Sequence, residues 1–273
     1  GFPLSQIVRE AGHPVVAYDV REDALDAFAE SGGEVAESPA AVARMCRSVH
    51  VVVVTDEQAE AVVFGEDGIF AGFEASDGGL LVVHSTVTPD TVEKFSDRAP
   101  EGVAVIDAAM SGGSERAEVG DIALMVGGDE DIVDWYRPVL EPMGREVFYL
   151  GPVGSGLAAK LANNLALHVT MAGTFEAIDL AGAYGVSEDD LLAVMEQSTG
   201  DSYFVRHFDF LTREYLETHP AGPYAMARNS RKNLMQALAL GESVGEALPM
   251  AGIASQLVPE TYTELADDMR EED

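Results

Sequence analysis

The sequence has almost no cysteine. Cys46 is the single thiol in 273 residues, so the chain cannot form an intrachain disulfide. Secreted proteins that depend on a framework of disulfides are therefore excluded, because each bridge needs two cysteines. A lone thiol is typical of a reducing compartment, and we expect the protein to be cytoplasmic.

Long uninterrupted apolar segments are also lacking. The longest helical pattern, near residues 156–183, includes Lys160, Asn163, His168 and Glu176, which are too many polar groups for lipid. We therefore expect no membrane partner. Hydrophobic residues nevertheless make up 47% of the chain, which indicates a globular protein of one large domain or two ordinary ones.

Positive charge is scarce. Sixteen Lys and Arg residues face 48 Asp and Glu residues, the net charge is −32, and Lys94, Lys160 and Lys232 are the only lysines. The acidic residues are spread along the chain, which indicates a uniformly solvated acidic surface. Such a surface repels nucleic acid and stays soluble where salt screens its charges. The sequence therefore predicts a halophilic protein of a high-salt cytoplasm, without a nucleic-acid partner.

The first half of the chain alternates short apolar runs with amphipathic helical stretches. Runs such as the four valines at 51–54 are apolar at every position, which is typical of strands covered on both faces. A mainly parallel sheet flanked by helices follows from such strands. We expect an α/β fold with a Rossmann-type doubly wound sheet, whose strands lie at 15–19, 49–55, 80–85, 103–107, 122–126 and 147–150.

From Gly154 onward the strand signals disappear and long helical patterns follow. The turn-rich sequence Gly-Pro-Val-Gly-Ser-Gly at 151–156 separates the two patterns. The sequence therefore predicts a dinucleotide-binding domain over residues 1–152. It predicts an all-α domain for substrate binding and oligomerisation over residues 153–273.

The chain opens with part of a nucleotide-binding unit. Gly1 begins a predicted helix, and the strand after that helix ends in Asp19, where an acidic residue can bind the ribose hydroxyls of a dinucleotide. An ordinary turn residue is the alternative interpretation of Asp19. The first strand of the unit belongs at the centre of a doubly wound sheet, so we expect it, with the rest of the glycine loop, upstream of Gly1.

Four further segments place polar or glycine residues at predicted strand and helix ends. They are His84-Ser85-Thr86-Val87-Thr88-Pro89, Asp107-Ala108-Ala109-Met110-Ser111-Gly112-Gly113, the segment from Gly154 to Asn164, and Arg231-Lys232-Asn233-Leu234. In this order and spacing they resemble the β-hydroxyacid dehydrogenase family, typified by 3-hydroxyisobutyrate dehydrogenase and tartronate semialdehyde reductase. The resemblance runs from residue 1 to about residue 255.

Lys160 is the candidate proton-transfer residue. Reduction of a carbonyl leaves an alkoxide that needs a proton, the reverse direction needs a base, and a lysine of lowered pKa can serve both. The Gly- and Ala-rich surroundings of Lys160 make an unpartnered ammonium costly. Asn164 lies four residues further on and shares the same helix face. An exposed helix lysine and a helix-interior polar residue are the alternative interpretations of this pair.

The resemblance implies a site for a small carboxylate substrate. Ser111, Gly112 and Gly113 would present backbone N–H groups and one hydroxyl at the carboxyl end of a strand, which suits a carboxylate. An ordinary turn is the alternative. Asn164 is the second substrate-binding candidate.

The resemblance also implies a nicotinamide cofactor. Asp19 would repel a 2′-phosphate and so favours NAD, while Arg21 keeps NADP open. Thr86 corresponds to the family's contact near the nicotinamide ribose, and Val53 and Val54 stand where the family has Leu-Pro over the cofactor. The remaining cofactor-binding candidates are Gly1 and Lys232. No group of histidines has the spacing of metal ligands, and we expect no metal.

Three departures from the family pattern weaken any choice of substrate. Ala109-Met110 replace Pro-Val, Asn233 replaces an aspartate, and a glycine-containing C-terminal segment is not recognisable. Three alternatives therefore stay open: an imine reductase on the same scaffold, a phosphogluconate-type dehydrogenase, and a non-catalytic relative. Lys160 speaks against the first, and Asn163-Asn164 in an acidic chain against the second.

The expected activity is the reversible oxidation of a short β-hydroxy acid to its semialdehyde. NAD or NADP accepts the hydride and Lys160 transfers the proton. The resemblance further implies a homodimer or homotetramer.

Overall fold

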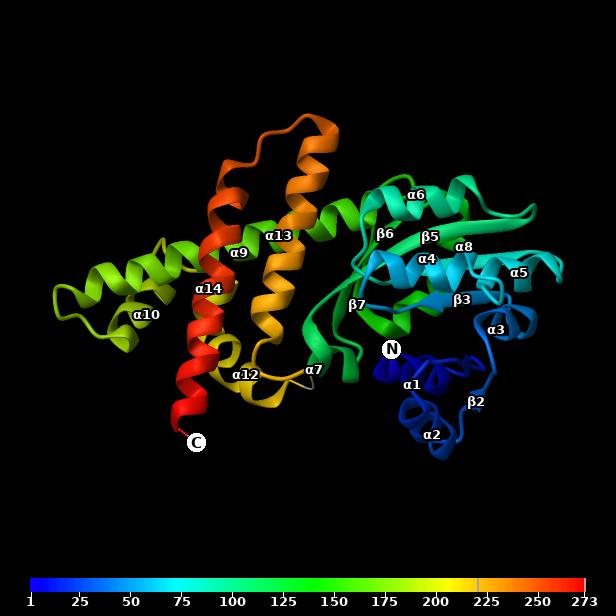
Figure 1. The fold of residues 1–273 in the computed structure, drawn as a ribbon, viewed down its shortest axis with the longest axis horizontal. Helices are drawn as coiled ribbons and strands as arrows, with labels where there is room; N and C mark the ends of the chain where they lie inside the picture. Colours follow the sequence, from blue (N-terminus) through cyan, green and yellow to red (C-terminus); the bar gives the residue numbers. More distant parts are fainter. Residues whose placement is uncertain (220, 273) are drawn as a thin grey trace. The chain divides into compact units, whose positions relative to one another are not determined.

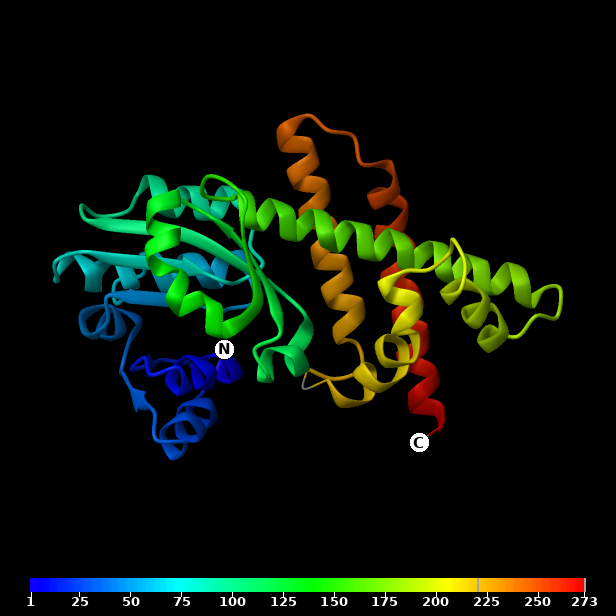
Figure 2. The ribbon, with the colours of Figure 1, turned by 180° about the vertical axis from the view of Figure 1, so that it is seen from behind.

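The computed structural model describes residues 1–219 and 221–272, with the side chains of all but residues 114, 115, 271 and 272. Internal contacts divide the chain into a sheet unit, Gly1–Lys160, and a helical unit, Leu161–Asp273. The predicted fold class, an α/β sheet followed by helices, is confirmed. Figures 1 and 2 show the two units from opposite sides.

A five-stranded sheet is the centre of the sheet unit. Its order is β3-β4-β5-β6-β7, and only the β5–β6 pair is antiparallel, so the sheet is mainly parallel. The strands are β3 (Ser48–Val51), β4 (Gly79–Val83), β5 (Val103–Ser111), β6 (Ile122–Gly127) and β7 (Gly144–Tyr149).

Alternating side chains bury both faces of this sheet. On β4, Leu81 and Val83 join one core cluster while Leu80 and Val82 join the other, because successive strand residues point to opposite faces. Helix α4 lies in front of the sheet in Figure 1, and helix α8 lies in front of it in Figure 2, so helices cover both faces. The helices of the unit are α1 (Phe2–Glu10), α2 (Glu22–Glu30), α3 (Pro39–Met45), α4 (Asp56–Phe64), α5 (Ile69–Glu74), α6 (Pro89–Asp97), α7 (Gly113–Glu118), α8 (Glu130–Leu140) and the 3-10 turn η1 (Glu141–Met143).

Local sequence fixes where several of these helices begin. The Ser38 side chain accepts from the amide of Ala41 at the start of α3. Thr55 and Gln58 form a reciprocal capping box on α4, and Asp129 caps α8. Each cap satisfies amides that have no partner inside the helix.

Two short strands form a separate parallel pair. β1 (Val16–Ala17) pairs with β2 (Glu34–Val35), and neither pairs with the five-stranded sheet among the described residues. The prediction of a strand near Val16 is therefore confirmed, although the strand is shorter than the apolar pattern suggested. β2 was not predicted, because two residues give no periodic signal.

The run of four valines is only partly a strand, which corrects one prediction. β3 ends at Val51, whereas Val52 is 40% exposed and Val54 is 64% exposed in the segment that leads into α4. An apolar sequence therefore continued past the end of the buried strand.

The helical unit contains the rest of the long helix α9 (Ser155–Gly182). A buried core that includes Met171, Phe204, Leu234 and Tyr262 holds its helices together. These helices are α10 (Glu188–Glu196), α11 (Tyr203–Arg206), the π-helical turn η2 (Phe210–Glu214), α12 (Tyr215–Thr218), α13 (Ala225–Val244) and α14 (Pro249–Glu272). Within the described part of the chain, no helix combines the length and the apolar character needed to cross a membrane.

Candidate active site

The loops after β3, β4 and β5 carry most of the predicted site residues of the sheet unit. Val53 and Val54 follow β3, Thr86 follows β4, and Ser111 ends β5. Because β3, β4 and β5 are parallel neighbours, their carboxyl ends meet at one edge of the sheet. Ligands bind at this edge in open α/β sheets.

Two hydrogen bonds hold the first two loops together. The amide of Val53 donates to Ser85 Oγ at 2.6 Å, and that hydroxyl donates in turn to the carbonyl of Val51 at 3.3 Å. Ser85 is buried and directly precedes the half-buried Thr86. The position of Thr86 is therefore tied to the end of β3.

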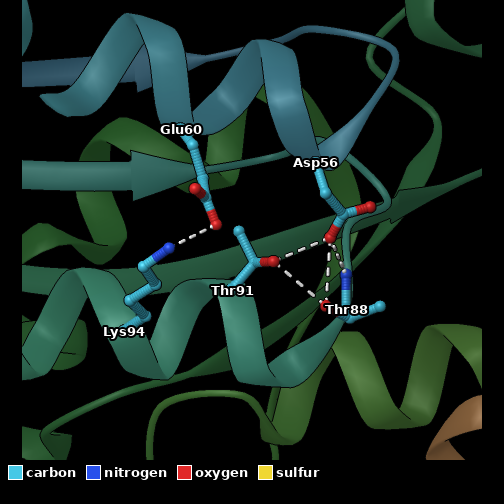
Figure 3. Close-up of polar contacts among 5 residues, drawn as sticks. All are labelled: Asp56, Glu60, Thr88, Thr91 and Lys94. Carbon is cyan, nitrogen blue, oxygen red and sulfur yellow. Dashed lines mark hydrogen bonds and ion pairs between the residues drawn. The ribbon is translucent and has the colours of Figure 1, made fainter. Parts of the chain in front are cut away.

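A polar clasp of Asp56, Thr88 and Thr91 joins the helices that follow these loops (Figure 3). One carboxylate oxygen of Asp56 accepts from the amide of Thr88 at 2.8 Å, from its hydroxyl at 3.0 Å and from the hydroxyl of Thr91 at 2.8 Å. Further along the same two helices, Lys94 Nζ donates to Glu60 at 2.7 Å. The clasp fixes the start of α6 against the start of α4.

The start of α1 lies beside the exposed segment after β3. Gly1 caps α1, and a Cβ atom at Gly1 would lie 3.8 Å from the Cβ of Val52. No side chain among the described residues caps this helix start, so its first-turn amides suit a phosphate group.

Asp19 lies just beyond β1 and is exposed. Its Oδ1 accepts from the amide of Arg21 at 2.9 Å, which orients the carboxylate in a turn. The guanidinium of Arg21 pairs with Asp23, so this cation is already engaged by an anion. The role of Asp19 toward a ribose remains a prediction.

The Ser111-Gly112-Gly113 segment forms a tight turn from β5 into α7. Gly112 has φ +150°, and a Cβ there would lie 3.0 Å from the Ile122 side chain. Gly113 has φ +81°. These backbone angles favour glycine, and the turn lies at the carboxyl end of β5.

Lys160 lies in the second turn of α9 and is half-buried. Burial lowers the pKa of its ammonium from 10.5 to about 8. Among the residues that the structure describes, none forms a hydrogen bond or ion pair with its Nζ atom. An amine of this pKa can both donate and accept a proton near neutral pH.

Two predicted residues lie in the helical unit. Asn164 is 7% exposed and lies one helical turn beyond Lys160 on α9. Lys232 is half-buried on α13. Their roles toward substrate and cofactor remain predictions.

The structure adds a buried hydrogen-bond chain that sequence reasoning missed. His84 Nδ1 donates to the carbonyl of Ala108 at 2.7 Å, so its Nε2 accepts from His50 Nδ1 at 2.7 Å. His50 Nε2 lies 2.7 Å from the hydroxyl oxygen of Tyr136, and that hydroxyl donates to Ser48 Oγ at 2.6 Å. Burial lowers the pKa of His84 to about 4 and keeps the pair neutral. The chain anchors the loop that carries Thr86, and the contiguous motif His84-Ser85-Thr86 was its one sequence signal.

No group of three or more potential metal-ligating side chains comes together in the described residues.

Two protein-family models match the chain. Residues 1–151 match the family model described as the NAD binding domain of 6-phosphogluconate dehydrogenase. Residues 154–272 match the model described as NAD-binding of NADP-dependent 3-hydroxyisobutyrate dehydrogenase.

Curated relatives cover nearly the whole chain. A 3-hydroxyisobutyrate dehydrogenase of Pseudomonas aeruginosa is 31% identical over 264 residues, which are 94% of this chain and 87% of the relative. An NAD-dependent L-serine dehydrogenase of the same organism is 30% identical over 262 residues, with the same shares.

Solved structures show the same fold. A Mycobacterium tuberculosis 3-hydroxyisobutyrate dehydrogenase, solved with L-serine, has a TM-score of 0.84 at 28% identity and covers 97% of this chain and 91% of its own. An imine reductase of Myxococcus stipitatus, in complex with NAD⁺, has a TM-score of 0.66 at 18% identity and covers 96% of this chain and 90% of its own. The second likeness concerns the fold alone.

A sheet unit with an NAD-binding family match, followed by helices with a dehydrogenase family match, defines a nicotinamide-dependent dehydrogenase that acts on a CH–OH group. The chain belongs to the β-hydroxyacid dehydrogenase family, and the resemblance seen in the sequence motifs is confirmed.

Proposed function

We propose that the protein oxidises a short β-hydroxy acid reversibly to its semialdehyde, with Lys160 as the proton-transfer residue. The observation that carries the proposal is the half-buried ammonium of Lys160, which has no hydrogen-bond or ion-pair partner among the described residues and whose pKa is lowered to about 8 by burial. In the oxidation direction the neutral amine accepts the proton of the substrate hydroxyl. In the reduction direction the ammonium returns it.

The Ser111-Gly112-Gly113 turn is assigned to the substrate carboxylate. Its open backbone amides and the Ser111 hydroxyl can donate to carboxylate oxygens. Asn164, one helical turn beyond Lys160, is assigned to the same substrate. Relatives named as dehydrogenases of 3-hydroxyisobutyrate, L-serine and L-threonate agree with a small hydroxylated carboxylate.

NAD is the cofactor that the chain's own residues fit best. The start of α1 can bind a phosphate and Asp19 can bind ribose hydroxyls, while Val53, Val54, Thr86 and Lys232 are assigned to the nicotinamide half. Asp19 would repel a 2′-phosphate, and Arg21 is engaged by Asp23. When bound, the nicotinamide supplies hydride acceptance and donation.

Two wider properties are also proposed. The net charge of −32 supports a high-salt cytoplasm as the working environment. Membership of the family supports a homo-oligomer, which sedimentation of the purified protein would distinguish from a monomer.

The reaction is tested by NADH formation from a panel of hydroxy acids in high-salt buffer. The panel contains 3-hydroxyisobutyrate, L-serine and L-threonate, each beside its amide, which keeps the hydroxyl but lacks the carboxylate. We expect turnover of at least one acid and a KM at least tenfold higher for its amide. No turnover of any acid, or equal use of acid and amide, would contradict the proposal.

A further inference from the structure

Asp107 is the most deeply buried carboxylate near the proposed site. It lies on β5, its residue is 0% exposed, and its strand neighbours are Val83 on β4 and Gly127 on β6. Burying a carboxylate costs free energy unless donors satisfy it. The hydrogen-bond partners of Asp107 therefore indicate why it is there.

Those partners are backbone amides at the start of α9. The amide of Gly154 donates to Oδ1 at 2.7 Å, and the amide of Leu157 donates to Oδ2 at 2.7 Å. A negative charge at a helix start is stabilised by the helix dipole, and charge-assisted bonds of this kind are stronger than neutral ones. Burial raises the pKa of Asp107 to about 6, although the hydrogen bonds from these amides act in the opposite direction. The carboxylate is therefore ionised above that pH.

Two glycines make this approach possible. A Cβ at Gly127 would lie 2.6 Å from Asp107 Oδ1, and a Cβ at Gly156 would lie 2.7 Å from Oδ2 and 2.2 Å from the carbonyl oxygen of Met125. β5, β6 and the first turn of α9 are therefore packed without space for a methyl group. This close packing restricts how the first turn of α9 can lie against the sheet.

Along the chain contacts, Asp107 connects the residue proposed for proton transfer with the turn proposed for carboxylate binding. Lys160 follows Leu157 by three residues, which is about 4.5 Å along the helix axis. In the other direction, Ser111 follows Asp107 by four residues on β5, and alternate strand residues share a face. Asp107 thus joins the helix that carries the amine to the strand that carries the carboxylate-binding turn.

We infer that Asp107 is a positioning residue for the dehydrogenase reaction: by holding the first turn of α9 on β5, it sets where Lys160 stands relative to the Ser111-Gly112-Gly113 turn. The inference rests on the proposed function of Lys160. Asp107 acts through the helix, because its carboxylate oxygens accept from the amides of Gly154 and Leu157, whereas burial lowers the pKa of Lys160. A displaced helix start would leave Lys160 better solvated and further from the reacting oxygen.

The test is Asp107→Asn, which keeps the shape of the side chain but replaces one acceptor oxygen by an NH₂ group that faces an amide N–H. We expect kcat to fall about 10- to 100-fold, since a shift of about 1 Å at a reacting group has effects of this size. We expect the Kd of NADH to stay within about twofold. The pH at which the rate reports deprotonation of Lys160 should rise from about 8 toward 10.5, because the amine becomes more solvated.

Asp129→Asn is the matched control. Asp129 caps α8 by accepting from the amides of Asp131 at 3.1 Å and Ile132 at 3.3 Å, and α8 carries no residue of the proposed site. It undergoes the same chemical change, and asparagine is an equally good cap. We expect unchanged kcat, unchanged NADH affinity and an unchanged pH profile.

All variants are compared at equal amounts of folded protein, measured by circular dichroism. If Asp107→Asn melts below the assay temperature, Asp107→Ser replaces it, because the smaller hydroxyl can still accept from one amide. An unchanged kcat together with an unchanged pH profile in the folded variant would show that Asp107 serves stability alone and would overturn the inference.

A readout without turnover separates this inference from the proposed function. The chain has three lysines, so the ¹³Cε resonances of a lysine-labelled apo protein can be assigned with Lys160→Met. We expect the Lys160 resonance to titrate at higher pH in Asp107→Asn than in the wild type. An unchanged titration would overturn the inference, whereas an inactive wild type with a shifted titration would overturn only the proposed function.

Discussion

Lys160 is a single residue that lowers the free energy of unfolding of the protein. Its amine is buried without a described partner, and the resulting pKa of about 8 means that the folded state disfavours the ammonium form. A residue that weakens the fold and suits proton transfer is typical of a functional site. Of the other two lysines, Lys94 forms an ion pair with Glu60, and Lys232 lies on α13 in the helical unit.

Lys160→Met should therefore stabilise the protein near neutral pH. Between pH 8 and 10.5 the unfolded state binds more protons at Lys160 than the folded state, so wild-type stability rises with pH in that window. Below pH 8 the destabilisation caused by the buried ammonium is present in full. Allowing for partial exposure, we expect a gain of about 1–2 kcal/mol at pH 7.

Thermal unfolding of both proteins at pH 7 and pH 10 measures this gain. The difference in melting temperature should be largest at pH 7 and shrink at pH 10, while Lys94→Met, which removes a half-buried cation paired with Glu60, should show no such pattern. A variant less stable than the wild type at pH 7 would contradict the assignment of a desolvated amine.

Among the secondary-structure elements, the loops after β3 and β4 are linked to each other by hydrogen bonds. The Val53–Ser85 bond and the Asp56 clasp tie them together, so the backbone near Val53 and Thr86 is held before any nucleotide binds. Preorganised loops lower the free-energy cost of binding a ligand.

Asp56→Ala should weaken NADH binding about 3- to 10-fold, because the start of α6 and the preceding loop lose the acceptor of three hydrogen bonds. Fluorescence titration with NADH measures the Kd. Glu60→Ala removes the same charge and the other polar link between α4 and α6, yet it should leave the Kd unchanged, since partly exposed ion pairs contribute little. Equal effects of the two variants would mean that charge alone, and not the clasp, influences the cofactor.

The sequence predicted the strands well where both faces are buried and less well at their ends. β4, β5 and β6 lie where apolar runs placed them, but the valine run continued beyond β3 into an exposed segment. Motifs located the loops with Thr86 and Ser111. The anchoring role of Asp107 could not be predicted, because its partner Gly154 lies 47 residues away and the contact depends on how β5 meets the start of α9.

At the scale of the whole molecule, acidic charge dominates. A net charge of −32 on 273 residues opposes compaction through self-repulsion, and salt weakens that repulsion. The ion pairs that the described residues do form are largely exposed and add little. Stability should therefore depend on ionic strength more than on these pairs.

We expect the melting temperature to fall by several degrees when the protein is moved from molar to millimolar salt. Differential scanning calorimetry in potassium chloride measures the shift, and sucrose of matched osmotic strength controls for general solvent effects. An unchanged melting temperature would contradict adaptation to a high-salt cytoplasm.

Proton transfer by Lys160 in hydroxy-acid oxidation is the proposal on which the assigned function depends. Its most direct test is the turnover of Lys160→Met with NAD and the best acid of the panel, beside Lys94→Met. We expect a loss of at least a thousandfold in kcat for Lys160→Met with unchanged NADH binding, and wild-type turnover for Lys94→Met. Turnover of Lys160→Met within tenfold of the wild type would contradict it.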